Sequence, residues 1–574
     1  MKSVTEIISW LNTSEHVKCI LADISEVGPA PGSNFFLSST VYDSNGVSYD
    51  ASITGGLSFS ESLNLEGTPS LGIGSLEIVN VGGINDNYLT YVWNKRPIKI
   101  YLGDPSWPKS DFVLIFDGLI QELTAPNENT LSFTLFDKLQ RLNDPVSEKT
   151  LKSSAPTTTI VVTGATITSN IARLTYATQA SAPFTVGQSI TVTGIPNFNG
   201  TFTVTLCNTT LVQYALSATN QTATINPSLA KVSNAPIYSQ STQDTVLPLL
   251  FGECFNVTPL LVDNGSSNLG GQVYMVHDGT IDEIIEVRDN GVPIPVEIDL
   301  NTGTFELLTS PYGTITCSAK GSTPYSNTVA GIITKIVTGY GTEENRFQTT
   351  EVDFSSFNNE SAVGLYCNER INILEVCSNL AKSVQANLVC PAIVVNNDQV
   401  SVSKLRLVEI KVPTDTPKYY LNDDNMVLNS LSISEVFPVK PSVKLAYCKN
   451  HSVQVTTAAG VNPASKFEDE YIFVSAVNST KRTLYRDSGT VTEEQTLLLS
   501  TTQAQTEANK RLALWQDQRF IITASYLPYL IFAQLGDTVQ VQSDRFGLSN
   551  GKLGMIYSIT RNWVTGQVEI GVLI

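Results

Sequence analysis

The chain has 574 residues, which is too long for one hydrophobic core because single cores rarely grow past about 250–300 residues, so about three to five domains are expected. Its apolar content of 42%, its 37 glycines and the scarcity of long helical patterns favour a β-rich globular protein. The 53 acidic and 35 basic residues give a net charge of −18, which argues against tight binding of nucleic acid, since acidic surfaces repel phosphate.

The cysteines and the N-terminus indicate the compartment. Eight cysteines, at 19, 207, 254, 317, 367, 377, 390 and 448, form no Cys-x-x-Cys pair and no regular framework. They predict mostly buried free thiols made in a reducing cytoplasm. The first residues lack an uninterrupted apolar segment, and no run approaches the roughly 18 apolar residues of a membrane helix. We expect a soluble protein without a signal peptide.

Residues 1–150 have the pattern of one β-barrel domain. A short helix is predicted over residues 4–14, where Ile7, Ile8 and Leu11 share one face. Apolar and β-branched runs then predict strands at 17–26, 35–43, 48–59, 74–80, 97–102, 112–124 and 130–137. A domain of this size can bury a core of its own.

Residues 151–235 differ in composition, since Thr, Ser, Asn and Ala dominate and charged side chains are nearly absent. Strands are predicted at 159–162, 171–176, 189–193 and 201–206, and their alternation of apolar and Thr residues is typical of a sandwich with one wet face per sheet. The stretches 183–194 and 198–204 resemble an immunoglobulin-like module that is inserted in many virion proteins. We therefore expect an inserted immunoglobulin-like β-sandwich.

Two units are predicted after the insertion. Residues 236–330 contain strand patterns near 272–276, 283–288, 292–297, 304–308 and 313–318, which predict a β-rich domain. Residues 331–429 predict an α+β domain. Its helices are marked by Ile332, Ile333, Ile336 and Val337 and by Ile371, Leu374, Cys377, Leu380, Ala381 and Val384, and its hairpin joins 388–395 to 399–407.

Residues 430–574 predict the last barrel. Ala504, Ala508, Leu512 and Trp515 recur at helical spacing, which predicts a helix that must pack on another element. Strands at 520–524, 535–541, 555–559 and 567–572 follow, separated by turn-forming clusters, and predict an antiparallel meander. The loop 457–464 has Val461 as its only sizeable aliphatic side chain, so we expect it to be the most mobile part of this domain.

Groups that could carry catalysis or bind metal are few. His277, Asp278, Asp282, Glu283 and Glu286 could form a metal or acid–base cluster, but we favour an exposed turn before a strand with solvated carboxylates. Cys367, Cys377, Cys390 and Cys448 are ten, thirteen and fifty-eight residues apart, unlike the ligands of a compact zinc or iron–sulfur loop. Cys377 lies on the apolar face of its predicted helix, which favours a core role.

Other motifs give no stronger signal. The sequence has neither a Gly-x-Ser-x-Gly elbow nor a phosphate loop. The acidic run 422–425 lacks the central glycine and distal glutamate of a calcium loop, so we predict a solvated turn. Tyr526, Tyr529 and Phe532 could form a sugar platform, but buried packing or subunit contact is the preferred interpretation. We predict that the protein is not an enzyme and has no catalytic, cofactor-binding or metal-binding residues and no cofactor.

Three groups of short motifs occur in a fixed order. The first comprises Lys99–Asp104, Phe112–Ile120 and Leu135–Lys138, and the second is Lys444–Gln454. The third is a helix rich in Ala, Arg and Leu followed by Leu535–Val539, Arg545–Leu548, Gly551–Leu553 and Arg561–Trp563 with a last alternating strand. This order resembles that of the baseplate hub or tail-tip hub proteins of tailed phages, and the resemblance covers about four fifths of the chain.

The resemblance implies a fold and a function. The fold class would be mainly β and multidomain, with tube-like antiparallel β-barrels at 1–150 and 430–574, the inserted β-sandwich, and the small α+β domain. The family forms a homotrimer whose two barrels per subunit present a pseudo-six-fold ring to the hexameric tail tube. The chain would then be a structural virion protein at the tail tip, made in the host bacterial cytoplasm, that lines the DNA exit channel.

The resemblance also implies partners, and two other functions stay open. The expected partners are the distal tail or tail tube protein, the tape-measure protein and a central fibre or plug protein, with transient DNA passage and no specific DNA binding. The alternative is a tail adhesin that holds a host-surface glycan weakly through the inserted module. A cell-wall hydrolase, acting through Asp278, Glu283 and Glu286, is the third hypothesis.

Overall fold

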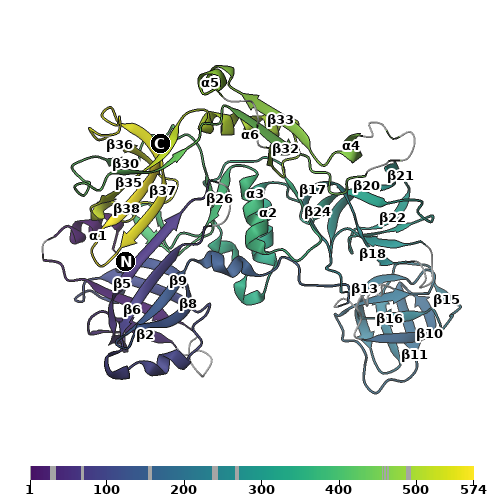
Figure 1. Cartoon of the computed structure of the whole chain (residues 1–574). Helices are drawn as coiled ribbons and strands as arrows, with labels where there is room; N and C mark the ends of the chain where they lie inside the picture. Colours follow the sequence, from purple (N-terminus) through teal and green to yellow (C-terminus); the bar gives the residue numbers. More distant parts are fainter. Residues whose placement is uncertain are drawn as a thin grey trace.

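The computed structural model describes residues 2–574 apart from 14, 26–33, 66–69, 153–157, 235–243, 265–270, 455–456, 458–460, 462–464, 487–490 and 492. The chain forms two lobes joined by a central unit of helices and a small sheet (Figure 1). One lobe holds both the N-terminal and the C-terminal segments, and the other holds residues from about 150 to 325. The fold is mainly β, as the sequence predicts.

A single large sheet runs through the lobe that holds both termini. Eight of its strands follow one another antiparallel in the order β8 (Val113–Asn127), β9 (Thr130–Phe136), β6 (Ile73–Val79), β5 (Ile53–Ser62), β37 (Lys552–Asn562), β38 (Val568–Leu573), β35 (Arg519–Tyr526) and β31 (Ser432–Phe437). The first four come from the N-terminal part and the last four from the C-terminal part. The two predicted barrels are therefore fused through the β5–β37 pair.

Further strands extend this sheet past β8 and branch from β37. Past β8 lie β7 (Pro97–Gly103), β1 (Cys19–Ile24), β2 (Phe35–Ser38), β4 (Val47–Ala51) and β3 (Tyr42–Ser44), and β36 (Thr538–Val541) with β30 (Tyr419–Leu421) pairs onto β37. Strands β6 and β9 alternate strictly, so that Leu76, Ile78, Leu131, Phe133 and Leu135 point into the first core while their neighbours face out. This alternation is why the sequence pattern located these strands well.

The predicted N-terminal helix is α1 (Val4–Leu11), which ends three residues earlier than expected. Ser3 and Glu6 form a capping box at its start, and Ile7 and Leu11 are buried. The helix also contacts the hairpin of β27 (Val394–Asn396) and β28 (Gln399–Ser401), because Asp398 in its turn accepts hydrogen bonds from the backbone and hydroxyl of Thr5 at 2.9 and 2.8 Å. Part of the predicted α+β domain thus packs against the N-terminal helix, and Val400 of its hairpin belongs to the first core, against which Val395 packs.

The inserted module forms a ring of strands. Its order is β10 (Thr159–Thr168), β11 (Ile171–Tyr176), β14 (Leu211–Ala215), β13 (Gly200–Cys207), β12 (Ser189–Thr193) and β16 (Lys231–Ser233), and β16 pairs back to β10; β15 (Gln221–Ala223) adds to β10. An immunoglobulin-like sandwich has two separate sheets, whereas here β10 and β13 each pair on both sides and connect the two halves. The module is therefore better described as a small closed barrel around one core.

The rest of the second lobe holds two sheets that cover the predicted 236–330 region. One contains β21 (Val292–Pro293), β20 (Ile281–Asp289), β24 (Ile315–Ser322), β17 (Leu249–Val257) and β25 (Gly364–Cys367). The other contains β18 (Leu260–Asp263), β19 (Val273–Met275), β23 (Thr304–Leu307) and β22 (Val296–Asp299). The two sheets share a core that includes Val276, Phe305 and Ala319.

The central unit takes residues from two predicted domains. It combines α2 (Val329–Gly339), α3 (Ile373–Lys382) and α6 (Thr501–Trp515) with the sheet β33 (Ile472–Val477), β32 (Ser442–Tyr447) and β34 (Glu493–Gln495), around one apolar core. Strand β26 (Ala386–Val389) pairs with β29 (Arg406–Glu409) beside α3. Within the predicted 430–574 barrel, residues 442–515 therefore leave the large sheet, and the chain rejoins it at β35.

Short helices fill the connections. The α-helices are α4 (Ser465–Glu468) and α5 (Ser479–Leu484). The 3₁₀ turns are η1 (Val81–Gly83), η2 (Asp86–Thr90), η3 (Lys109–Asp111), η4 (Lys138–Asn143), η5 (Glu343–Asn345), η6 (Thr349–Glu351) and η7 (Pro528–Leu530).

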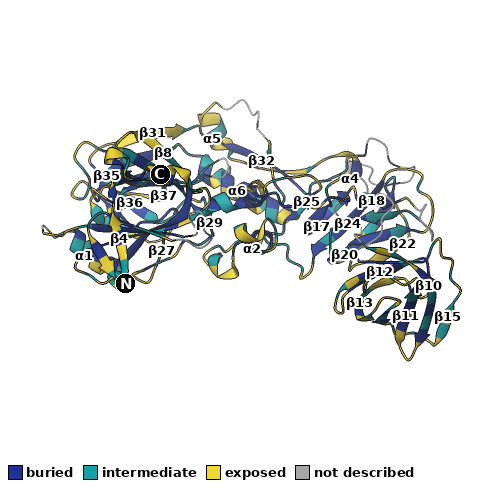
Figure 2. Cartoon of the chain, turned by 90° about the horizontal axis from the view of Figure 1, so that it is seen from below, coloured by how far each residue is buried: buried dark blue, intermediate teal, exposed yellow. Residues whose placement is uncertain are grey.

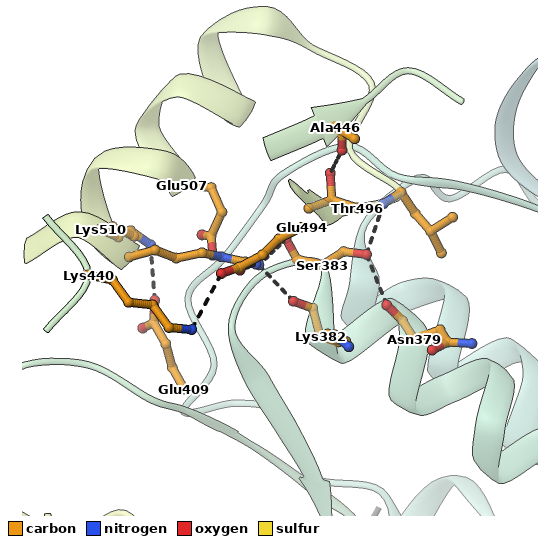
Figure 3. A network of polar contacts seen from close by, with 12 residues as sticks. Asn379, Lys382, Ser383, Glu409, Lys440, Ala446, Glu494, Thr496, Glu507 and Lys510 are labelled. Carbon is orange, nitrogen blue, oxygen red and sulfur yellow. Dashed lines mark hydrogen bonds and ion pairs between the residues drawn. The ribbon is translucent and has the colours of Figure 1, made fainter. Parts of the chain in front are cut away.

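Two buried ion pairs hold the parts together. Arg561 on β37 donates to Glu61 on β5 at 2.8 Å and to two carbonyl oxygens of residues 531 and 533, so this pair crosses the joint between the two halves of the large sheet. In the central unit, Arg511 on α6 donates to Glu507 and Glu494 and to the carbonyl of Lys382 at the end of α3 (Figure 3). Both arginines are under 5% exposed.

Candidate functional site: a polar sheet face with two open edges

The outward face of the large sheet is lined by hydroxyl groups. Its members are Ser58 and Ser60 on β5, Ser75 on β6, Thr130, Ser132 and Thr134 on β9, Ser558 and Thr560 on β37, Thr523 and Ser525 on β35, and Ser432 and Ser434 on β31. These residues are half-buried or exposed, while their strand neighbours point into the cores. The alternation along every strand therefore places one chemical class of side chain on one surface.

The register carries this face across the joint between the two halves. Ser60 pairs with Thr560, Thr560 with Glu569, and Glu569 with Ser525, so that one row crosses four strands. The hydroxyls of Ser60 and Thr560 lie 2.9 Å apart. The face is thus continuous over strands that lie about five hundred residues apart in the sequence.

Acidic side chains lie on this face. Glu122 on β8, Glu77 on β6 and Glu569 on β38 point outward, and no ion pair joins them to any residue that the structure describes. Across β5, β6, β9, β38 and residues 558–562, all of which are described, the outward positions carry no Lys or Arg. Over these strands a surface of hydroxyls and carboxylates repels phosphate, and Arg519, at the start of β35, is the cation at an outward position of the neighbouring strand.

The first open edge is β31. Among the described residues it pairs with β35 alone, and Ser432, Ile433, Ser434, Glu435 and Val436 are all exposed (Figure 2). A strand paired on one side leaves a row of backbone donors and acceptors available to another strand.

The second open edge is the last part of β8. Strand β7 accompanies β8 only as far as Leu119, after which the backbone of Lys95 and Arg96 bonds to Ile120. In the part of the chain that the structure describes, residues 122–127 then pair with β9 alone, and they are mostly exposed. The eight-strand series from β8 to β31 therefore ends in an open edge on each side.

The structure does not bring the predicted acid–base cluster together. His277 is buried, not exposed as the preferred turn interpretation expected, and its Nδ1 accepts the backbone N–H of Leu250 at 2.9 Å. Burial lowers the pKa of this imidazole to about 4, so it is neutral near pH 7. Three of its four carboxylates are paired with a cation: Asp278 with Lys149 at 3.0 Å, Glu283 with Lys320 at 2.6 Å, and Glu286 with Arg288. The fourth, Asp282, is exposed, as the preferred interpretation expected.

Six of the eight cysteines are buried, and Cys207 and Cys448 are half-buried. Cys377 is fully buried on α3, as its position on the apolar face predicts, and Cys367 and Cys390 are buried too. Burial raises the pKa of the Cys367 thiol to about 12, which keeps it protonated. Within the described parts of the chain, no group of three or more His, Cys, Asp or Glu side chains has the arrangement of a metal site.

The remaining candidates are structural. The side chain of Asn425 accepts from the backbone of Asn422 and closes the acidic run as a turn. Tyr526 and Phe532 are buried, and Tyr529 donates to the carbonyl of Tyr420 at 3.0 Å, so these aromatic rings pack as preferred. Most of the loop 457–464 lies outside the described residues.

Sequence reasoning missed the residues that join the parts. The partners Glu61 and Arg561 are five hundred positions apart, and only the fold brings them together. Glu507 and Arg511 carry a local signal, since oppositely charged residues four apart on a helix can pair, but this spacing is usual for an exposed face. The two open edges could not be predicted from the sequence either, because they are defined by which strands pair.

Comparisons with known proteins give structural likeness without sequence likeness. No protein-family model and no curated protein matches the chain. Solved structures similar to it include a tail protein from Neisseria meningitidis MC58, with 9% identity and a TM-score of 0.38 over 97% of this chain and 96% of that chain. The 43 kDa tail protein of prophage MuSo2 from Shewanella oneidensis has 10% identity and a TM-score of 0.37 over 97% and 98%. A chain of the native gene transfer agent virion has 13% identity and a TM-score of 0.38 over 58% and 84%.

Among the residues that the structure describes, no helix combines the length and apolar character needed to cross a bilayer.

Proposed function

We propose that this chain is a structural protein of a phage tail that forms a trimeric hub at the distal end of the tail tube and lines the DNA exit channel. The observation that carries the proposal is the continuous series of eight strands, four from each half of the chain, with the edge strand β31 at one end and the open segment 122–127 of β8 at the other. Three such series joined end to end give six four-strand units around one axis. A ring of this symmetry matches a hexameric tube.

The outward face supplies the wall of the channel. A closed ring with this face inward is lined by hydroxyls and by carboxylates such as Glu77 and Glu569. Duplex DNA binds proteins mainly through cations that neutralise its phosphates, so a wall of this kind lets DNA pass without holding it. The order of the sequence motifs, which resembles that of tail hub proteins, agrees with this role.

The other parts of the chain then serve assembly. The second lobe and its inserted barrel lie away from the large sheet, on the far side of the central unit (Figure 1). We assign the neighbours that the resemblance implies, namely the tail tube or distal tail protein, the tape-measure protein and a central fibre or plug, to the rims of the ring. Its place is the virion tail tip, and the ring has no enzymatic role in this proposal.

The test is the assembly state of the purified full-length chain. We expect mass photometry to find trimers and negative-stain electron microscopy, classified without imposed symmetry, to show three-fold rings with a central opening. Elongated monomers at every concentration, with or without the neighbouring tail proteins, would contradict the hub.

The adhesin remains the second candidate because of one observation about the inserted barrel. Residues 153–233 contain no Asp or Glu, and the exposed side chains of β13 include Thr201, Thr203 and Thr205, a neutral hydroxyl surface suited to weak contact with sugar. The chain enters and leaves the barrel side by side, since Leu151 donates to the carbonyl of Thr245 at 2.8 Å, so deletion of 153–233 keeps the junction. A hub assembles without the barrel, whereas an adhesin loses binding to host cells.

A further inference from the structure

We infer that β31 of one copy docks head to tail on the open segment of β8, residues 122–127, of a second copy, with an apolar seam behind the paired strands. This inference rests on the proposed ring and names the contact that closes it. It commits to one occupant for each open edge, a second copy of this chain.

The two edges fit each other in length and in position. Strand β31 offers six residues, and the open part of β8 offers six, at opposite ends of one series of strands. Pairing β31 with the β31 of another copy would leave both β8 edges exposed to further association. If β31 of each copy pairs with β8 of the next, the backbone groups of every open edge are hydrogen-bonded once the ring is closed. Head-to-tail contacts give such closed rings when the rotations between successive copies add up to a full turn.

Apolar side chains on β31 lie on the core side of the sheet. Ile433 pairs with Ile522 and Val436 with Phe520, whose side chains belong to the second core, whereas Ser432 and Ser434 share the polar face with Thr523. Ile433 is 39% exposed and Val436 is 61% exposed, because the sheet stops there. A neighbouring strand would cover both.

One apolar residue lies on the core side of the open part of β8, and another lies in the turn beside it. Leu123 packs partly against the first core, beside its strand partner Phe133. The turn 92–96 is bonded to β8 through Lys95 to Ile120 at 2.8 Å and through Asn94 to Gln121 at 3.1 Å, which places Val92 next to the start of the open edge. Val92 is 63% exposed.

Charge substitutions at two exposed positions test the seam. Val436→Lys and Val92→Glu each introduce a charged side chain that would lose its water when the seam forms. Each alone should therefore raise the protein concentration at which half of the chains are assembled by about tenfold or more. Both side chains are more than half exposed in the single chain, so we expect its melting temperature to stay unchanged. The chain with both substitutions regains assembly, because the ammonium introduced on β31 of one copy then faces the carboxylate introduced beside β8 of the next.

The control is Val186→Lys, a 68% exposed position on the inserted barrel, which leaves assembly unchanged. If the unmodified chain forms trimers and Val436→Lys forms them equally well, the docking inference is wrong while the hub stands. If Val436→Lys blocks assembly but the double substitution restores nothing, Val92 is not its partner and the assigned seam is overturned. If the unmodified chain never trimerises, the hub itself fails.

Discussion

Arg561 and Glu61 form the contact that holds the two halves of the large sheet together. Their carboxylate and guanidinium are buried, and Glu61 also accepts the backbone N–H of Ala392 at 2.7 Å. Because removing one partner leaves a buried charge unpaired, Arg561→Leu should lower the free energy of unfolding by about 3–5 kcal/mol.

Denaturant titration of the full chain, followed by tryptophan fluorescence, measures this loss. Arg561→Leu combined with Glu61→Leu should recover much of the stability, because no charge then remains buried. Lys411→Met breaks an exposed pair with Asp415 and should change stability by less than about 1 kcal/mol. A loss as small as that in Arg561→Leu would refute the role given to this pair.

Asp137 should make stability fall as pH rises. Burial raises its pKa from 3.8 to about 8, although the backbone N–H groups of Gly72 and Leu139 bond to its two oxygens and favour the charged form. The folded protein then holds a proton that the unfolded chain has lost between about pH 4 and pH 8. The contribution of Asp137 to the free energy of unfolding is fully present below about pH 4 and is lost as pH rises through about 8.

Melting temperatures from pH 5 to pH 9 check this prediction. Asp137→Asn keeps a neutral polar side chain, so relative to it the unmodified chain should become progressively less stable over that range. A difference that does not change with pH would mean that Asp137 is ionised throughout.

At the scale of elements, Arg511 joins α6 to α3 and β34. Its guanidinium donates to Glu507 at 2.8 Å, to Glu494 at 2.6 Å and to the carbonyl of Lys382 at 2.8 Å (Figure 3). Arg511→Lys offers a single ammonium in place of a planar fork, so we expect it to destabilise the chain nearly as much as Arg511→Ala, by about 3–5 kcal/mol. Chemical denaturation measures the stability of both variants. If Arg511→Lys is as stable as the unmodified chain, the planar guanidinium is not required.

The same helix shows what the sequence could predict. The apolar spacing located α6 and the burial of Ala504 and Ala508 correctly. The spacing did not predict that Glu507 and Arg511 are buried on the same face, where opposite charges that satisfy each other can enter a core. Periodicity records polarity and cannot record such pairing.

Contacts between residues that are close in the sequence were predictable, and contacts between distant residues were not. The hairpin β27–β28 follows from its local turn, in which Asn397 and Asp398 adopt positive φ. The β5–β37 pair and the departure of residues 442–515 from the last barrel depend on contacts between distant segments, which no local pattern contains. The polar face was visible as scattered Ser and Thr residues, but only strand register assembled it into one surface.

At the scale of the whole molecule, the proposed channel wall makes a prediction about DNA. Ser60→Lys with Thr560→Lys puts two cations on neighbouring strands in the middle of the face, since these residues are paired. Assembled rings with both substitutions should retain DNA, and virions that carry them should eject DNA more slowly, because each cation can neutralise a phosphate.

Retention of DNA by the rings is measured by filter binding at several salt concentrations, and it should weaken as salt rises. Thr203→Lys with Thr205→Lys on the inserted barrel adds the same charge away from the wall and should have no effect on passage. Equal DNA binding by both pairs would place the channel elsewhere.

The pairing of β5 with β37 also sets the order in which the molecule can be completed during synthesis. Strand β5 ends at Ser62 and β37 begins at Lys552, so the first four strands leave the ribosome long before their neighbour exists. At about 5–20 residues per second, the wait is on the order of half a minute or more. Only a chain that already includes β35, β37 and β38 can present the full series of eight strands, so shorter nascent chains cannot enter the proposed ring.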